Sequence, residues 1–426
     1  MLLGLYWRVM LNDNRKIKVL HILESFGGGG VEEWVKYIST LCDKDRFNFK
    51  IYFCGYIYDK DLFDYKDELE KAGVEVIYRG INLSGHKRKL NAAKEITDKN
   101  HYTRQLRRLA IYVSLNITAF FQLIKILRKE RFDIIHIHLY RLFITGGLAG
   151  KLFKIPVVHT ISGLKSQYDS YQKMVFHVYR YFNFLICTFI TAASKDELIK
   201  YAKIPERKIR FIKSAADLSR VKYIDRENNS ILSEFNLRDS FPVLLSVGRM
   251  DPEKGHIYSI NAIKGLILKY PNIRLILLGD GSELEKLRRS VIDLGLNEYV
   301  TLPGFRNDLN KFHSLSDIYL RTSIYEGANM ASILAMAYGK AVIGFNTKAE
   351  TEIIADGDNG ILVPPKDIEG LRKAISNLAN NKELRETIGK KAKEYVYNNC
   401  DIMTAIRTYE SIYDNVAGRL CLKTKI

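Results

Sequence analysis

A turn near the middle of the chain carries two cations at a spacing that suits a diphosphate. Residues 246–255 read Ser-Val-Gly-Arg-Met-Asp-Pro-Glu-Lys-Gly and follow an apolar run that predicts a strand. Gly248 precedes Arg249, which offers a planar fork of donors, and Lys254 adds a compact charge; both cations bind phosphate groups well. A solvated turn in which Arg249 pairs with Asp251 or Glu253 explains the same residues equally well.

A second loop places a carboxylate beside a glycine, just before a predicted helix over residues 333–339. The loop consists of Tyr325, Glu326, Gly327, Ala328, Asn329, Met330, Ala331 and Ser332. Glu326 is placed to accept hydrogen bonds from sugar hydroxyls, while the free backbone N–H groups of the helix N-terminus face an anion. The alternative is that Glu326 only stabilises the helix by lying near its positive end.

A glycine run follows the first predicted strand and precedes a predicted helix. It comprises Gly27, Gly28, Gly29 and Gly30. Without Cβ atoms, backbone N–H groups can approach a phosphate or sugar closely. The spacing is neither that of a dinucleotide-binding loop nor that of a Walker loop, and a flexible strand-to-helix turn is the alternative.

The elements that must position these loops are short apolar runs bounded by turn residues, which alternate with helical patterns. Unbroken apolar runs of this length are typical of parallel strands covered by helices on both faces. They occur at 18–23, 49–54, 74–79, 133–138, 156–160, 184–193, 209–212, 243–248, 273–279, 299–304, 317–323, 341–346 and 360–365. In such sheets ligands bind beyond the carboxyl ends of the strands, where all three loops fall.

The runs predict an α/β protein with two doubly wound, Rossmann-like parallel-sheet domains. We expect an N-terminal domain over residues 1–213 and a C-terminal domain over 214–403. A last helix, predicted over 404–418, could belong to either, and residues 404–426 could pack back onto the first. The chain has 426 residues, of which 47% are hydrophobic and 27% charged, which indicates a globular protein with room for two cores.

The cysteines and the apolar segments bear on the compartment. The five cysteines are scattered and include no Cys-x-x-Cys pair, so we expect reduced thiols in a cytoplasmic protein, with neither a disulfide framework nor a zinc site. The apolar segment from Val175 is interrupted by His177, Arg180 and Asn183, and we expect no membrane-spanning helix. Residues 1–9 are interpreted as a start-site extension or a small interfacial anchor.

Taken in order, the motifs resemble the GT-B glycosyltransferases, specifically the retaining family 4 enzymes that use nucleotide sugars. The resemblance runs from about residue 16 to the C-terminal helix. Besides the three loops, it rests on the segments 132–138, 156–160, 191–194, 278–281, 303–305, 335–337 and 359–365.

The resemblance implies a role for each candidate residue. Arg249 and Lys254 would neutralise the leaving nucleotide diphosphate, and Glu326 would contact donor-sugar hydroxyls. The backbone of residues 328–331 and the glycine loop would line the same pocket, as would the matching positions Gly248 and Phe305. His138 matches a histidine at the acceptor-facing end of an N-terminal strand; a hydrogen-bonded core histidine is the alternative, and it fits His136 better. The family needs no metal and no cofactor beyond the nucleotide sugar.

The sequence departs from the family pattern at three places. A second glutamate that usually holds the nucleotide ribose is Leu334 here, which cannot accept a hydrogen bond. The usual Asn-Gly-Val-Asp reads Ser-Ala-Ala-Asp at 214–217, and a usual Gly-Gly reads Lys348-Ala349. These changes leave two questions: which residue binds the ribose, and how residues with a Cβ atom replace glycines that normally allow unusual backbone conformations and close approach.

We therefore expect a glycosyltransferase that moves a sugar, with retention, from a nucleotide-sugar donor to a lipid-linked or saccharide acceptor. Surface polysaccharide, lipopolysaccharide or capsule biosynthesis is the expected setting. Two alternatives stay open: a GT-B-fold scaffold subunit of a glycan assembly complex that has lost turnover, and a nucleotide-sugar epimerase. The presence of Arg249, Lys254 and Glu326 argues against the scaffold, because these are the charged groups that transfer needs.

The excess positive charge lies almost entirely in the first half of the chain. The formal net charge is +18; residues 1–213 hold 37 basic and 21 acidic residues, whereas the remainder holds 29 and 27. Basic residues alternate with aromatic and aliphatic ones over 86–131, which favours a peripheral element on an anionic membrane surface, at the inner face, for 86–112. For 116–131 an ordinary crossover helix is preferred. No nucleic-acid-binding module accompanies the charge, so we expect no nucleic-acid partner.

Overall fold

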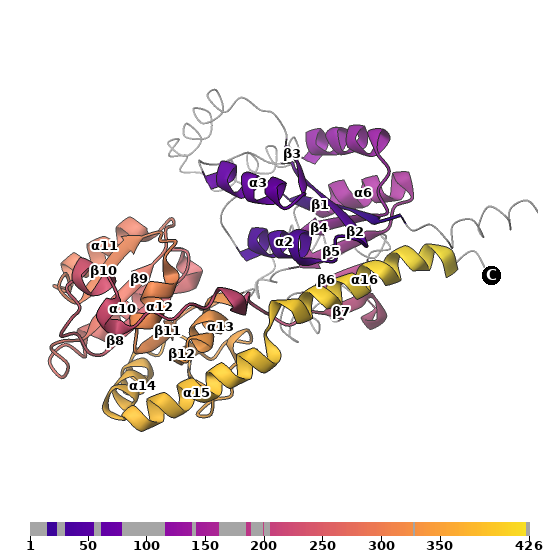
Figure 1. The fold of residues 1–426 in the computed structure, drawn as a ribbon. Helices are drawn as coiled ribbons and strands as arrows, with labels where there is room; N and C mark the ends of the chain where they lie inside the picture. Colours follow the sequence, from indigo (N-terminus) through magenta and orange to yellow (C-terminus); the bar gives the residue numbers. More distant parts are fainter. Residues whose placement is uncertain are drawn as a thin grey trace, which may run out of the picture. The chain divides into compact units, whose positions relative to one another are not determined.

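The computed structural model describes residues 15–23, 30–54, 61–78, 116–138, 142–161, 185–188, 199, 205–326 and 329–422. The chain divides into two compact units (Figure 1). Unit 1 comprises residues 1–212 and 406–426, and unit 2 comprises residues 213–405. The predicted boundary lay between residues 213 and 214, and the predicted last helix is here shared between the units.

The described part of unit 1 is built on a seven-stranded parallel sheet in the order β3-β2-β1-β4-β5-β6-β7. Its strands are β1 (Ile17–Leu23), β2 (Phe47–Phe53), β3 (Glu75–Tyr78), β4 (Ile134–His138), β5 (Val157–Ile161), β6 (Leu185–Thr188) and β7 (Ile209–Phe211). Its helices are α2 (Gly30–Leu41), α3 (Asp61–Lys71), residues 116–129, α6 (Phe143–Phe153), the 3₁₀ turn η3 (Glu206–Lys208) and most of α16 (Ile402–Leu422).

The two faces of this sheet have different chemistry. One face is aliphatic: side chains such as Leu20, Ile135 and Ile137 pack against Leu123 of helix 116–129 and Ala149 of α6. The other face is aromatic and polar, and α16 packs there through Tyr409 and Tyr413. Successive residues of a strand point to opposite faces, so the run KVLHIL supplies both surfaces.

The described part of unit 2 holds a six-stranded parallel sheet in the order β10-β9-β8-β11-β12-β13. Its strands are β8 (Val243–Val247), β9 (Arg274–Leu278), β10 (Val300–Gly304), β11 (Ile318–Arg321), β12 (Ala341–Phe345) and β13 (Ile361–Val363). Its α-helices are α9 (Ile231–Glu234), α10 (His256–Lys264), α11 (Leu284–Asp293), α12 (Leu309–Leu315), α13 (Met330–Ala337), α14 (Ile368–Asn380) and α15 (Lys382–Asn399). Its 3₁₀ turns are η4 (Leu218–Arg220), η5 (Arg226–Asn228), η6 (Pro252–Lys254) and η7 (Glu350–Glu352).

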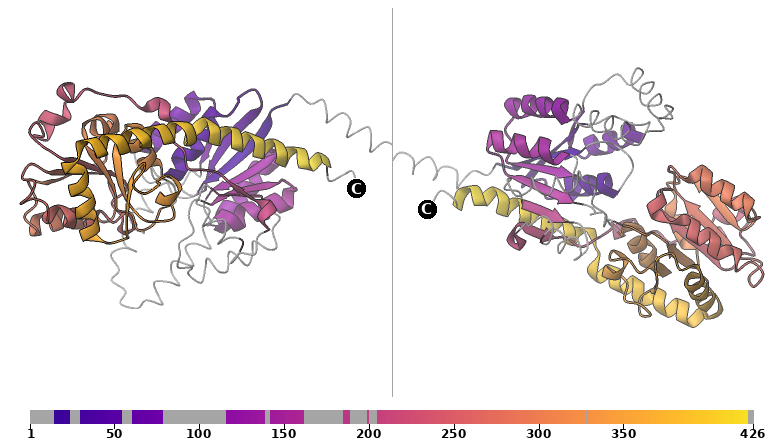
Figure 2. Two further views of the ribbon diagram at one scale, coloured as in Figure 1. Left: turned by 90° about the horizontal axis from the view of Figure 1, so that it is seen from below. Right: turned by 180° about the vertical axis from the view of Figure 1, so that it is seen from behind.

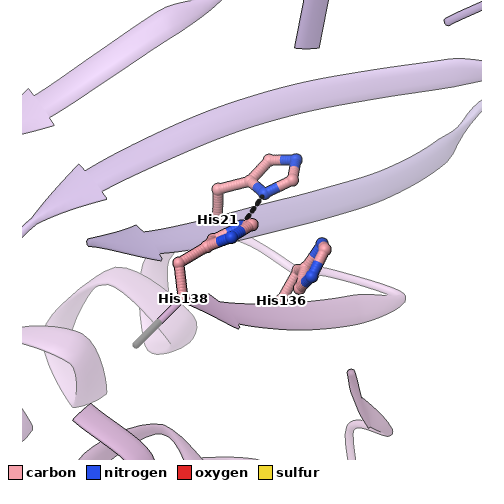
Figure 3. A group of neighbouring side chains, drawn as sticks. All are labelled: His21, His136 and His138. Atoms are coloured by element: carbon pink, nitrogen blue, oxygen red, sulfur yellow. Dashed lines mark hydrogen bonds between the residues drawn. The ribbon is translucent and has the colours of Figure 1, made fainter. Parts of the chain in front are cut away.

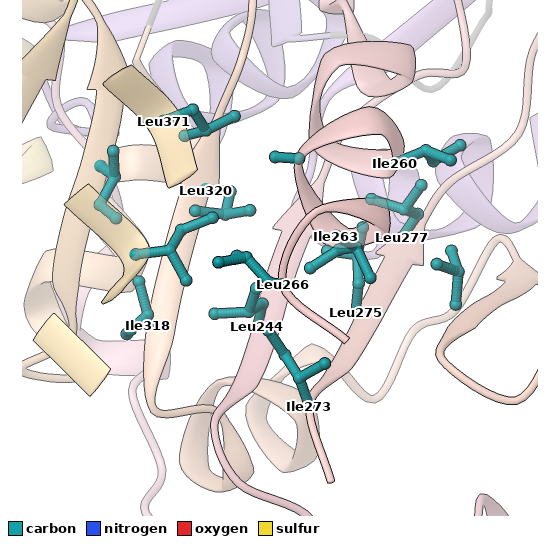
Figure 4. Packing of buried hydrophobic residues seen from close by; sticks show 14 of the residues in the cluster. Leu244, Ile260, Ile263, Leu266, Ile273, Leu275, Leu277, Ile318, Leu320 and Leu371 are labelled. Atoms are coloured by element: carbon teal, nitrogen blue, oxygen red, sulfur yellow. The ribbon is translucent and has the colours of Figure 1, made fainter. Parts of the chain in front are cut away.

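Both faces of the unit 2 sheet are covered by helices, as the two views of Figure 2 show. On one face Leu244, Leu275 and Leu320 pack against α10 and α14 (Figure 4). On the opposite face Leu245, Ile276 and Tyr319 pack against α12, α13 and α15. The two-sided burial explains why the strands of this unit read as unbroken apolar runs.

Each of the thirteen strands in the described residues overlaps one of the predicted runs, and its ends differ by one or two residues wherever the run is fully described. The expectation of two parallel-sheet α/β domains is confirmed. Searching the described residues finds no helix that is both long enough and apolar enough to cross a membrane.

Candidate active site

The candidate site of unit 2 begins at the carboxyl end of β8, where the chain turns through η6 into α10. Gly255 closes η6 with φ +61°, and a Cβ there would lie 2.2 Å from the carbonyl oxygen of Thr322. Only glycine fits both the left-handed conformation and this close approach. The Lys254-Gly255 pair of the sequence motif therefore fixes the turn that holds Lys254 beside the end of β11.

Glu326 lies between two cations. Its Oε2 atom is 2.7 Å from the Lys254 ammonium, and its Oε1 atom contacts the guanidinium of Arg321, the last residue of β11. The Glu326 side chain is 2% exposed and that of Arg321 is 5% exposed. Such a buried carboxylate is tolerated because both oxygens face positive charge.

Arg321 is itself anchored to the end of β8. One terminal nitrogen donates to the carbonyl oxygen of Val247 at 2.9 Å. A Cβ at Gly248 would stand 3.3 Å from the same nitrogen, so the glycine leaves room for the guanidinium. Gly248, predicted to line a donor pocket, thus lies directly beside the buried arginine.

A second buried glutamate approaches the same arginine. Glu350 of η7 has no exposed surface, and its Oε1 atom lies 3.8 Å from Arg321 Nε and accepts a hydrogen bond from the Ser332 hydroxyl at 3.3 Å. Burial and the charge of Glu326 raise the pKa of Glu350 to about 7, although Arg321, Ser332 and Lys254 act against them. Glu350 is therefore the carboxyl of this group that is readily protonated near neutral pH.

The pKa of Glu326 is lowered, whereas that of Glu350 is raised. Burial favours the neutral acid, but the charges of Arg321 and Lys254 and the hydrogen bonds to the carboxylate outweigh burial and hold the pKa of Glu326 below its usual range. Burial and the nearby Arg321 lower the pKa of Lys254, whereas Glu326 acts to raise it. At neutral pH the group presents an ionised Glu326.

Arg249 is more accessible than Lys254. Its side chain is 57% exposed, and its guanidinium pairs with Asp251 at 2.9 Å and with Glu253 at 3.6 Å. This is the pairing that a solvated turn predicts. An exposed guanidinium in high dielectric exchanges partners at little cost, so its predicted role in binding a diphosphate stays a prediction.

The helix α13 begins at Met330, four residues after Glu326 in the sequence. Asn329 is the residue before the helix, but its side chain donates to the carbonyl oxygen of Ala349 and makes no cap on the helix. The first-turn N–H groups, those of Met330 and Ala331 included, therefore keep their capacity to bind an anion. Leu334 packs against the apolar cluster under α13, and Ala349 has an ordinary φ of −69°.

Phe305, which is also predicted to line the donor pocket, lies apart from this group within unit 2. Phe305 follows the edge strand β10, is 65% exposed, and is separated from β11 by β9 and β8 in the sheet order. Gly30 begins α2 in unit 1. Gly28, Gly29, Gly327 and Ala328 lie outside the described residues.

His138 belongs to a histidine cluster of unit 1, which Figure 3 shows. His136 and His138 project from β4, and His21 projects from the neighbouring β1 with its Nδ1 atom 2.8 Å from His138 Nε2. All three rings have no exposed surface, and burial lowers the pKa of His21 to about 3. The structure thus places His138 in a buried, hydrogen-bonded cluster, and its predicted catalytic role stays a prediction.

The same cluster is a possible metal-ligand set. One ring nitrogen from each of the three histidines lies within 4.8 Å of the others. However, His136 already contacts the Tyr413 hydroxyl through Nδ1 at 2.8 Å and the Thr160 hydroxyl through Nε2 at 2.7 Å. A metal would have to replace one of these bonds, so the arrangement is better explained as a hydrogen-bonded network.

Sequence reasoning missed Arg321, Glu350 and His21. The signal for Arg321 was present, because an arginine inside an apolar run that is buried on both faces requires a buried partner. The run alone could not say which of the loop carboxylates supplies it. Glu350 and His21 carried no comparable signal, because their contacts depend on how separate strands and loops meet.

Comparison with known proteins identifies the family. A model of the glycosyl transferases group 1 matches residues 228–395, and a model of glycosyltransferase family 4 matches residues 62–220. The chain therefore belongs to the family 4, group 1 glycosyltransferases, and its fold is GT-B. It is a glycosyltransferase, as the sequence analysis predicted.

Two proteins similar in sequence and one solved structure similar in fold illustrate what the chain resembles. The chain is 27% identical to the Escherichia coli UDP-Gal:alpha-D-GlcNAc-diphosphoundecaprenol alpha-1,3-galactosyltransferase over 313 residues, 70% of this chain and 79% of that protein. It is 28% identical to the lipopolysaccharide core biosynthesis glycosyltransferase LpsE of Rhizobium meliloti, over 44% of this chain and 53% of that protein. The crystal structure of Anabaena Alr3699/HepE in complex with UDP-glucose aligns with a TM-score of 0.74 at 19% identity, covering 94% of this chain and 100% of that one.

Proposed function

We propose that this chain transfers a sugar from a nucleoside diphosphate sugar to a lipid-linked or saccharide acceptor, with retention of the anomeric configuration and without a metal. The observation that carries the proposal is the buried Glu326 carboxylate held between Lys254 and Arg321, next to the uncapped N-terminus of α13. Surface polysaccharide, lipopolysaccharide or capsule assembly is the proposed setting.

The chemistry of glycosyl transfer suits this arrangement. Positive charge develops on the sugar ring while negative charge develops on the departing diphosphate, and fixed cations stabilise the latter. Lys254, Arg249 and the N-terminus of α13 supply positive charge from the protein. Glu326 supplies a carboxylate that accepts hydrogen bonds from the hydroxyls of the donor sugar.

The names of the relatives support particular choices of donor and acceptor. The Escherichia coli relative is named for UDP-Gal and for a diphosphoundecaprenol-linked acceptor, and the Anabaena structure holds UDP-glucose. We propose a uridine nucleotide sugar as the donor and a polyprenyl-diphosphate-linked glycan as the acceptor.

The donor is tested by thermal shift with UDP, GDP and their sugars, in wild type and in Glu326→Gln. Lys286 offers a matched control, because it is a lysine of the same unit that pairs with Glu283 and is 72% exposed. We expect UDP to raise the melting temperature of wild type and of Lys286→Met, and less so that of Lys254→Met. No shift with any nucleotide would contradict the proposal.

Transfer is then tested with the nucleotide sugar that binds and with a membrane lipid extract. The anomeric configuration of the product, read from its proton coupling constants by NMR, tests retention. Equal turnover with and without a chelator tests the absence of a metal. An inverted product, or turnover that is abolished by the chelator and restored by a divalent ion, would overturn the corresponding part of the proposal.

We also propose a peripheral position at the cytoplasmic face of a membrane, which would supply such an acceptor. Helix 116–129 packs on the sheet through Leu123 and Leu127, as expected of a crossover helix, but its outer side adds to the basic surface. The exposed positions there include Ile117 and Phe121, followed by Lys125, Arg128 and Lys129. An apolar and basic surface of this kind binds anionic lipid, and salt weakens the binding. Co-sedimentation with anionic but not neutral vesicles, reversed by salt, is expected; equal behaviour with both would contradict it. The basic segment 86–112 lies outside the described residues.

A further inference from the structure

The two oxygens of the Glu326 carboxylate have separate counter-ions. Lys254 pairs with Oε2 and Arg321 with Oε1. One cation would be enough to neutralise one carboxylate, and burying a second carries an additional desolvation cost. The second carboxyl near Arg321 is that of Glu350, which lies 3.8 Å from Nε and is readily protonated near neutral pH, so neutrality alone does not account for the second cation.

The two cations are held very differently. Arg321 ends a central strand, is 5% exposed, and donates to the Val247 carbonyl oxygen, so its guanidinium is fixed by the sheet. Lys254 lies on the short turn η6, its side chain is 15% exposed, and its described hydrogen bond is the one to Glu326. A lysine side chain with four rotatable carbons on a turn can change partners, whereas the buried arginine cannot.

Under the proposed function, Lys254 pairs with two different anions at different times. It pairs with Glu326 in the unliganded chain and must face a diphosphate when a nucleotide sugar is bound. If Lys254 were the only counter-ion, its departure would leave a buried, unpaired carboxylate. Such a group takes up a proton or destabilises the fold. A protonated Glu326 would lose half of its capacity to accept hydrogen bonds from a sugar.

We propose that Arg321 is the permanent counter-ion of Glu326, a positioning residue that lets Lys254 move to the diphosphate of a nucleotide sugar while Glu326 stays ionised. The proposal rests on the proposed function for its ligand, but its claim about Glu326 concerns the chain alone. Arg321 touches neither sugar nor diphosphate in this scheme and acts through Glu326.

Other charged groups around Glu326 must be controlled in any test. Glu350 from η7 approaches Arg321 and has a pKa near 7, so it titrates in the useful range. His256 from α10 and Tyr319 from β11 also interact with Glu326, and Arg249 interacts with Lys254. We therefore place every comparison in a Glu350→Gln background, and measure each chain with and without Glu326→Gln so that the difference isolates Glu326.

The first experiment needs no ligand. Lys254→Met imitates the departure of Lys254, and the unfolding equilibrium is measured from about pH 8 to about pH 5. With Arg321 present, the effect of Glu326→Gln on the unfolding constant should not change over this pH range. With Arg321→Met added, Glu326 should gain stability on acidification, by up to about tenfold in the unfolding constant per pH unit below its raised pKa. Arg321→Lys should restore the flat profile.

Two outcomes overturn the proposal. If the Lys254→Met chain already gains Glu326-dependent stability on acidification, Arg321 does not suffice as the counter-ion, and this holds whether or not any Arg321 variant folds. If Arg321→Met leaves the profile flat, Arg321 does not control the ionisation of Glu326. Lower stability without a pH-dependent difference would show a structural role only.

The second experiment uses UDP as the probe. Calorimetry in two buffers of different ionisation enthalpy counts the protons taken up when UDP binds. Adding Arg321→Met to the Glu350→Gln chain should increase the uptake, by up to about one proton, and Glu326→Gln should abolish the increase. Unchanged uptake would contradict the proposal. If wild type binds neither UDP nor any other nucleotide tested, the proposed function fails, while the ligand-free experiment still decides the role of Arg321.

Discussion

Both units bury a polar network against a parallel sheet, but the two networks are built from different groups. In unit 1, His136 connects Thr160 of β5 with Tyr413 of α16, and His138 contacts His21; every member can be neutral. In unit 2, Arg321 gathers Glu326 and Glu350 while Lys254 closes the group. Neutral hydrogen-bonded groups are cheap to bury, whereas charges are not. Packing alone is enough to account for the first network, whereas the second buries charges at a cost that packing does not require.

The largest expected effect comes from breaking the charged network by removing one partner. Arg321→Met leaves two buried carboxylates facing only Lys254, and we expect unit 2 to lose about 3–5 kcal/mol of stability. Denaturant unfolding followed by hydrogen exchange of unit 2 amides measures the loss. Adding Glu350→Gln should recover part of it. A loss below about 1 kcal/mol would show that the network is less strongly coupled than its geometry indicates.

The next effect concerns turnover. Lys254→Met should lower kcat/KM by about 10²–10³, because one preorganised charge in a transition state has about this effect. The Lys286→Met chain, with the same change at an exposed position, should keep wild-type turnover. Near-normal turnover in both Lys254→Met and Arg249→Met would contradict the assignment of the two cations.

Acid should weaken unit 1 through its histidines. Burial depresses the pKa of His21 from 6.5 to about 3, and burial also lowers those of His136 and His138. The unfolded chain therefore binds protons first, so stability is full above about pH 6.5 and falls as the pH drops below it. The slope is roughly 1.4 kcal/mol per pH unit for each histidine. Hydrogen exchange of β1 and β4 amides at a series of pH values measures it; a flat response would contradict the prediction.

The effect of Glu350 on the pH dependence of stability should be opposite to that of the histidines. Its pKa is raised from 4.5 to about 7, so the folded chain binds the proton more tightly and stability falls as the pH rises between these values. Glu350→Gln should remove this dependence, and its stabilising effect relative to wild type should grow across the window. Exchange of β11 and β12 amides in the two chains tests this, and a difference that shrinks with rising pH would refute it.

The smallest effect is expected from the neutral network. Tyr413→Phe removes the hydroxyl that contacts His136 Nδ1, and we expect a cost of about 1 kcal/mol in unit 1. Thermal unfolding compares it with Tyr397→Phe, a change at a partly exposed tyrosine of α15. A cost as large as that of Arg321→Met would erase the distinction between the networks.

The strands of both sheets could be predicted from the sequence, because each strand leaves a local pattern of apolar residues. Runs such as KVLHIL and IRLILLG are short, unbroken and bounded by turns, so burial on both faces could be predicted from each run alone. Lys254 and Glu326 could be selected for a similar reason, since strand ends are where ligands bind. Their direct contact could not be predicted, because it depends on where β8 and β11 fall in the sheet order.

The pairing of Arg321 with its buried carboxyl partners could not be predicted from the sequence, although the position of Arg321 in an apolar run indicated that it needs one. Arg321 looked like a polar residue at the end of a strand, and Glu350 looked like one of several acidic loop residues. Their pairing requires η7 to pass beneath α13, which the Asn329 contact to Ala349 and the Ser332 contact to Glu350 secure. Such contacts are set by packing between elements and leave no periodic signal in the chain.

The position of α16 at the end of the chain affects the order in which the two units can fold during synthesis. Tyr413 and His136 are 277 residues apart in sequence, and all of unit 2 is encoded between the two parts of unit 1. A ribosome therefore completes residues 213–405 before the tyrosines that cover the histidines of β1 and β4 exist. Until then His136 lacks the tyrosine that contacts its Nδ1 atom, so the nascent chain passes through a long interval in which the second unit can fold and the first cannot finish.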